Sequence, residues 1–115
     1  PSPLAAILIG GVGGIIVVYG TKFLLSMKID DVVGAIPAHL FAGIWGTLAV
    51  PITNSGAKFG TQLLGVIAIN GTVFVVSLII WAIMKNTIGI RLSKEGETKG
   101  TDVTETGVIA YAIRD

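Results

Sequence analysis

The sequence predicts an all-α membrane protein, a polytopic bundle of three transmembrane helices followed by a polar tail. Hydrophobic residues make up 52% of the 115 residues and charged residues only 13%, whereas soluble domains carry about 25% charged residues. Three stretches contain no Asp, Glu, Lys or Arg at all: 1–21, 32–57 and 59–84. Each can form a helix of the roughly 20 residues needed to cross the bilayer. A helix also satisfies its own backbone hydrogen bonds in lipid.

The first helix is expected at 3–27, with Pro3 near its start, where the missing N–H of proline costs nothing. It contains the stretch GGVGG, 10–14. Such glycines weaken a helix in water, but small residues allow close approach between helices in a membrane.

The second helix is expected at 31–50, because the carboxylates of Asp30 and Asp31 suit a helix N-terminus. Pro37 should bend it. The turn-forming stretch PITNSGAKFG ends it, and the third helix follows at 61–85. The transmembrane region therefore covers 1–85.

The remaining residues, 86–115, form a polar C-terminal tail, and ten of the fifteen charged residues fall in 85–115. Spaced apolar residues interrupt its charges. Either the tail is solvated and partly disordered, or it docks on its own bundle or on a partner. The sequence leaves both possibilities open.

The placement of Lys and Arg predicts the orientation in the cell membrane, since cytoplasmic segments carry more of them. The connection between the second and third helices contains only Lys58. The other basic residues near helix ends flank the first connection, end the third helix or belong to the tail: Lys22, Lys28, Lys85, Arg91, Lys94 and Lys99. We therefore expect a cytoplasmic tail and an N-terminus outside.

The only histidine, His39, is the candidate functional residue. A helix that starts at Asp31 places it about 12 Å below the membrane boundary, close to the midplane. Ionisable residues at that depth are rare and usually functional. Helical spacing puts four small residues on the same face, Ala35, Ala42, Gly43 and Gly46. This bare face leaves room for another helix or for a lumen.

The alternative is that His39 is a structural residue that hydrogen-bonds to a neighbouring helix. In either case we expect a neutral imidazole, since burial disfavours the charged form. No second histidine and no acidic residue lies at membrane depth, so no metal site is expected. The chain shows no cofactor motif, no catalytic constellation and no basic patch for nucleic acid, which argues against an enzyme and against a nucleic-acid partner. Trp45 is expected to pack or to anchor the helix at the interface.

Three stretches of the sequence resemble the ammonium transporter family (Amt/Mep/Rh). KIDDVVGAIPAHLFAGIWGTLAV, 28–50, is similar to the penultimate transmembrane segment of that family, in which an Asp-Asp pair precedes a pore histidine and a Gly-Ile-Trp-Gly-like stretch. FGTQLLGVIAI, 59–69, resembles the start of its last helix. KNTIGIRLSKEGETKGTDVTETG, 85–107, resembles its cytoplasmic tail.

The resemblance implies that the chain is the C-terminal part of a subunit of about eleven helices, which assembles as a homotrimer with one pore in each protomer. It places His39 at the second of two hydrogen-bonded, neutral pore histidines, which accept ammonia, or a proton from ammonium. The partners it implies are lipid, ammonium or ammonia, the remainder of the subunit and, at the tail, a PII-type regulator.

The sequence departs from the family pattern at three points. Val32 follows the aspartate pair where proline is common, and Thr106 stands where a histidine is typical. Only the last three helices are present. Two other functions remain open: an ammonium-sensing membrane domain coupled to signalling, and a small three-helix accessory subunit.

Overall fold

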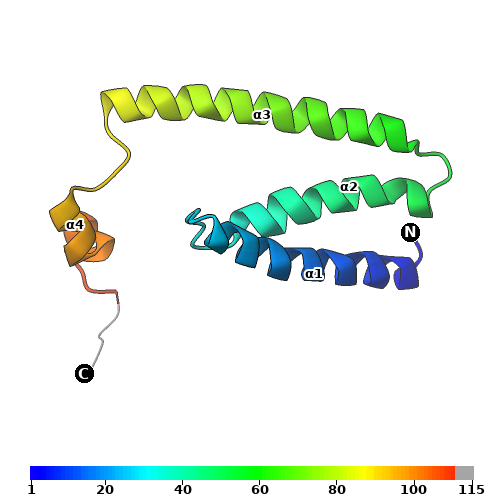
Figure 1. Ribbon diagram of the computed structural model, residues 1–115, viewed down its shortest axis with the longest axis horizontal. Helices are drawn as coiled ribbons and strands as arrows, with labels where there is room; N and C mark the ends of the chain where they lie inside the picture. Colours follow the sequence, from blue (N-terminus) through cyan, green and yellow to red (C-terminus); the bar gives the residue numbers. More distant parts are fainter. Residues whose placement is uncertain (111–115) are drawn as a thin grey trace. The chain divides into compact units, whose positions relative to one another are not determined.

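The computed structural model describes residues 1–110, which form helices joined by turns and contain no β-strand. They divide into two compact units, Pro1–Val73 and a second that begins at Phe74. The elements are α1 (Pro3–Ser26), η1 (Ile36–Phe41), α2 (Ala42–Thr53), α3 (Phe59–Thr87), α4 (Lys94–Lys99) and η2 (Asp102–Thr106) (Figure 1).

Helix α1 begins and ends close to the predicted bounds. The Ser2 hydroxyl accepts a hydrogen bond from the Ala5 N–H at 3.2 Å and caps the first turn. Beyond Ser26, Lys28 takes a left-handed conformation with φ of 58°, and its N–H donates to the Leu25 carbonyl at 3.0 Å. A left-handed residue cannot continue a right-handed helix, so α1 stops there.

The second helical segment begins at Ala35, four residues later than the expected start at Asp31. The reason is Gly34, whose φ of +68° interrupts any right-handed helix. Asp31 therefore stands outside the helix. Its backbone carbonyl accepts from the Gly34 N–H at 3.1 Å and closes the turn.

This segment opens with the π-helical turn η1 and continues as α2. Pro37 lies in η1, where its missing N–H and its ring disturb regular α-helical hydrogen bonding. The distortion expected at Pro37 takes the form of this wide turn. At the other end, α2 continues through Pro51 to Thr53 instead of stopping at Val50. Proline removes one hydrogen bond near the helix end, and the Asn54 N–H closes the last turn on the Val50 carbonyl at 2.9 Å.

Helix α3 is the longest element, with 29 residues, and extends two residues beyond the expected range at each end. It ends where Gly89, with φ of +75°, donates its N–H to the Met84 carbonyl at 3.0 Å. This arrangement satisfies a carbonyl of the last turn and turns the chain away from the helix axis.

Three segments are long and apolar enough to cross a membrane: Pro3–Ser26, Ile36–Thr53 and Phe59–Thr87. This confirms the predicted all-helical fold class, and the chain is a multi-pass membrane protein. Large apolar side chains cover the outside of these helices, as Ile7 and Leu64 do with 70% and 66% exposed area. A soluble protein would aggregate through such a surface, whereas lipid or other transmembrane helices can cover it.

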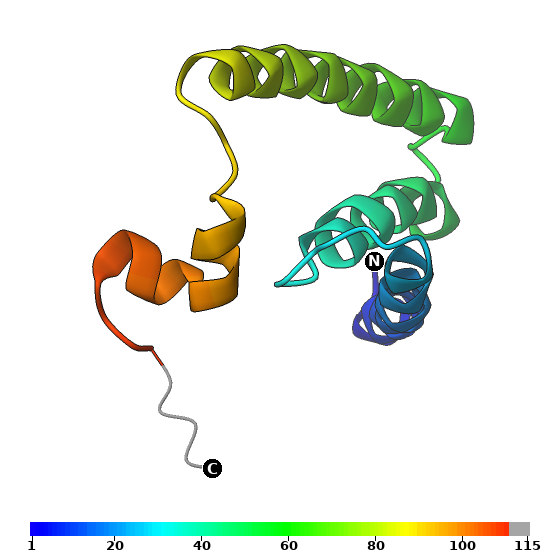
Figure 2. The same ribbon diagram turned by 60° about the vertical axis from the view of Figure 1, so that its left-hand side comes forward.

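Helices α1 and α2 lie side by side in the first unit, in both views (Figures 1 and 2). The residues buried between η1, α2 and α1 are few and mostly small: Gly20, Leu24, Pro37 and Ala49. Small residues bring the two backbones together, which is how helices associate in lipid.

The tail forms a small folded element instead of an unstructured segment as far as residue 110. Ser93 caps α4 by accepting from the Gly96 N–H at 3.1 Å. The Thr104 hydroxyl of η2 donates to the Gly96 carbonyl at 3.2 Å and joins the two short helices. Residues 111–115, which include Tyr111, one of the apolar residues of the tail, lie outside the described residues.

Candidate functional site

The helical segment that carries His39 is held at its start by Asp31. One carboxylate oxygen accepts from the Ala35 N–H at 2.9 Å and the other from the Ile36 N–H at 2.8 Å. Both N–H groups belong to the first turn and have no partner within the helix. Asp30 is exposed, and its side chain makes no hydrogen bond within residues 1–110. Of the two aspartates, the structure thus places only Asp31 at the helix start.

His39 lies in the middle of η1, four residues after Ala35. At about 1.5 Å per residue, this is a rise of roughly 6 Å from the start of the helix, about half the rise expected from a start at Asp31. The late start of the helix therefore leaves about one helical turn, instead of two, between its first residue and His39.

Pro37 and Phe41 hold one side of η1 against α1. Pro37 is fully buried, and Phe41 packs on Gly20. His39, two residues from each of them, is exposed on the opposite side. The structure therefore turns His39 away from α1.

Of the small residues predicted to share the face of His39, Gly43 is exposed, whereas Gly46 lines a pocket between α1 and α2 together with Ala6. A Cβ atom added at Gly43 or Gly46 would meet nothing within 4 Å outside the helix itself. Ala35 is exposed and Ala42 is half-buried. The side chain of His39 makes no hydrogen bond within the described part of the chain. Its imidazole is therefore available to a ligand or to a group from another segment.

No metal site involves these residues in the structure. Across residues 1–110, no group of three or more His, Cys, Asp or Glu side chains is placed to hold a metal ion.

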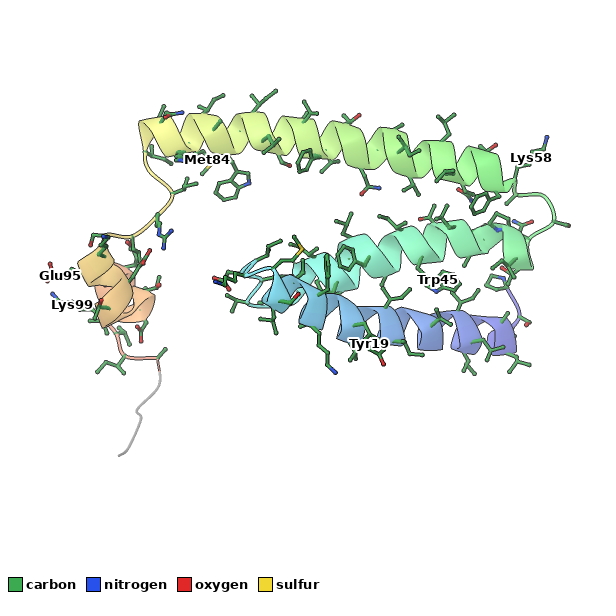
Figure 3. The ribbon with its side chains drawn as sticks, in the orientation of Figure 1. Tyr19, Trp45, Lys58, Met84, Glu95 and Lys99 are labelled. Atoms are coloured by element: carbon green, nitrogen blue, oxygen red, sulfur yellow. The ribbon has the colours of Figure 1, made fainter. Side chains whose placement is uncertain are left out.

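Two contacts fix the helix of His39 against α1, and sequence patterns indicated neither pairing. The first is the Phe41 ring on Gly20. The second is the hydrogen bond that the Trp45 indole N–H donates to the Ile9 carbonyl at 3.0 Å. Trp45 lies between α1 and α2 (Figure 3). A usable signal was the seven-residue spacing of Gly13 and Gly20, which puts both glycines on the face of α1 that meets these rings.

In the second unit, Arg91 and Glu97 form a two-contact ion pair, with Arg91 Nη2 and Glu97 Oε2 3.2 Å apart. Hydrogen bonding to Arg91 lowers the pKa of Glu97, and the same pair raises the pKa of Arg91. Lys99 pairs with Glu95 one helical turn away, at 2.7 Å (Figure 3). These pairs support the fold of the tail near α4.

Asp102 organises the end of the described tail. Its Oδ2 accepts from the Ala110 N–H at 2.8 Å. This bond, followed by one from the Val103 N–H, holds the pKa of the Asp102 carboxyl below its usual value. The carboxylate thus joins two segments eight residues apart.

Comparison with known proteins points to a single family. The sequence model of the Ammonium Transporter Family matches residues 1–111. Ammonium transporter Amt2 of Archaeoglobus fulgidus is 36% identical, over 95% of this chain and 28% of the relative. A putative ammonium transporter of Synechocystis is 39% identical, over 90% of this chain and 24% of the relative.

Ammonium transporter Amt1 of Haloferax mediterranei is 34% identical, over 91% of this chain and 21% of the relative. The chain thus spans between about a fifth and three tenths of the length of these relatives. No solved structure matches it.

Proposed function

We propose that this chain, which belongs to the Ammonium Transporter Family, forms the C-terminal part of a transporter subunit and carries ammonia or ammonium past His39. The relatives named above are described as transporters, which favours transport over a sensor or an accessory subunit. The observation that carries the proposal is the family match over residues 1–111, which includes the exposed His39 and the open space beside Gly43.

The surroundings of His39 suit a neutral solute better than an ion. The segment from 32 to 57 contains no charged residue. Moving an intact ammonium ion into such an apolar site costs many kcal/mol, because the ion loses its hydration shell. A neutral imidazole offers one donor and one acceptor. It can therefore hydrogen-bond to ammonia, or accept a proton from ammonium before ammonia moves on.

The rest of the pore belongs, in this proposal, to the remainder of the subunit. His39 faces away from α1, and space is open beside the exposed Gly43. A further helix, with a second histidine, fits that side. The proposal includes assembly as a homotrimer, an extracellular N-terminus for this segment, and a cytoplasmic tail open to a PII-type regulator. The charge placement and the family membership support these features.

The test is ammonium uptake by the intact subunit in liposomes, comparing the wild type with His39→Ala. We expect the variant to lose uptake or to lose its discrimination against potassium. Trp81→Phe is a suitable control, since Trp81 lies on α3 and is 54% exposed. Unchanged uptake together with unchanged discrimination in His39→Ala would contradict the proposed role.

A further inference from the structure

Trp45 makes a directional contact between the helix that carries His39 and α1. Its indole Nε1–H donates to the Ile9 carbonyl at 3.0 Å. Its Cδ1 atom lies 3.9 Å from where a Cβ at Gly13 would stand, so the ring packs along the glycine face of α1. Inside a membrane, water cannot replace a lost partner of the indole N–H. The hydrogen bond is therefore specific to one placement of α2.

We propose that Trp45 is a positioning residue, whose hydrogen bond to the Ile9 carbonyl sets the rotation of α2 about its axis and thereby the place of the His39 imidazole. This inference rests on the proposed role of His39 in transport.

The positions along the helix support this role. Trp45 follows His39 by six residues, which puts the two side chains about 120° apart around an α-helix. Trp45 therefore faces α1, while His39 faces the open side. A contact on one side can in this way determine where the other side points.

Because a second contact lies farther along α1, the motion of interest is rotation of α2 about its own axis. Phe41 meets Gly20, eleven residues after Ile9. Apolar packing of this kind is non-directional and tolerates small rotations. The hydrogen bond of Trp45 is directional: it prefers an N–H···O angle above about 150° and weakens steeply below about 120°. Of the two contacts, the hydrogen bond of Trp45 is therefore the more sensitive to the direction in which α2 is turned.

A small rotation of α2 is enough to displace the His39 imidazole. A side chain reaches about 6 Å from the helix axis, so a rotation of about 10° moves its end by about 1 Å. A shift of that size is enough to change reaction or recognition geometry strongly. The loss of one hydrogen bond can thus alter selectivity without unfolding the bundle.

The first measurement follows the helix pair directly. Ala6 and Val50 line the same pocket between α1 and α2. In the intact subunit, the pair Ala6→Cys with Val50→Cys should cross-link with a short bifunctional thiol reagent. We expect Trp45→Phe, which keeps an aromatic ring but removes the N–H, to change the cross-linking rate by about threefold, the size expected for one interhelical hydrogen bond in a membrane. Trp81→Phe is the matched control and should leave the rate unchanged.

The second measurement is the ratio of ammonium to methylammonium uptake by the same variants, without the cysteines. A positioning role predicts a changed ratio in Trp45→Phe and an unchanged ratio in Trp81→Phe. If Trp45→Phe does not fold, Trp45→3-benzothienylalanine keeps the bicyclic shape and lacks only the N–H.

The results separate this inference from the proposed function. If His39→Ala alters transport but Trp45→Phe changes neither measurement, the role of Trp45 is overturned and that of His39 stands. If cross-linking changes while the uptake ratio does not, Trp45 is a structural contact only, and positioning is overturned. If His39→Ala has no effect on transport, the proposed function fails, and positioning fails with it, whatever the cross-linking rate.

Discussion

The aromatic ring of Phe41 lies directly on the backbone of Gly20. A Cβ atom at position 20 would stand 2.6 Å from Cδ2 and 3.1 Å from Cε2 of that ring. In proteins, a Cβ atom essentially never lies within 3.0 Å of a heavy atom from a distant residue. Any side chain at position 20 therefore forces the ring or the helix to move. Gly20 is thus required for the close approach of α1 and η1.

Gly20→Ala should therefore destabilise the intact protein by about 1–3 kcal/mol, the usual cost of overpacking a tight contact. The measurement is the free energy of unfolding in mixed micelles. Phe41→Leu added to Gly20→Ala should recover part of the loss, because the smaller side chain makes room for the methyl group. Additive losses in the double variant would contradict a direct contact between these two positions.

Asp31→Ala should weaken the start of the helix that carries His39. Two N–H groups, of Ala35 and Ile36, lose their acceptors, and the loss of a helix cap costs about 0.5–2 kcal/mol. Hydrogen exchange at these two amides should speed up. The control is Asp30→Ala, which removes the same charge from the neighbouring position. Equal effects of the two variants would mean that the charge matters and the hydrogen bonds do not.

The lowered pKa of Asp102 predicts that the structure of the tail depends on pH. Its pKa is lower in the folded tail than in an unfolded chain, because the N–H groups of Ala110 and Val103 stabilise the carboxylate. Its contribution is therefore fully present above the ordinary aspartate pKa of about 3.9, and is lost as the pH falls through the lower pKa of the folded state. The Ala110 amide should lose its protection from hydrogen exchange over that acidic range.

Asp102→Asn is the matched variant for this prediction. The amide oxygen can still accept a hydrogen bond, but it does not titrate in this range. The variant should therefore show weaker protection of the Ala110 amide at neutral pH and a smaller change on acidification. A full acid transition in Asp102→Asn would assign the effect to other carboxylates, of which Glu97, paired with Arg91, is the first to test.

Much of the local structure was predictable because it depends on local composition. Three uncharged stretches predicted the three long helices, since the bilayer selects for length and hydrophobicity. The ends were less predictable. The pair Asp30–Asp31 did indicate a helix start, but Gly34 with its positive φ delayed the helix to Ala35, and the helix continued through Pro51.

The sequence by itself determined the fold class and made His39 the candidate residue, through hydrophobicity, charge placement and the scarcity of titratable groups. Only the tertiary structure decided which face His39 presents. That face depends on Phe41 against Gly20 and on Trp45 hydrogen-bonded to Ile9, contacts between residues 21 and 36 positions apart. Hydrophobic periodicity cannot reveal such pairs in a membrane helix, because lipid makes its entire surface apolar and leaves no polar side to mark the inward one.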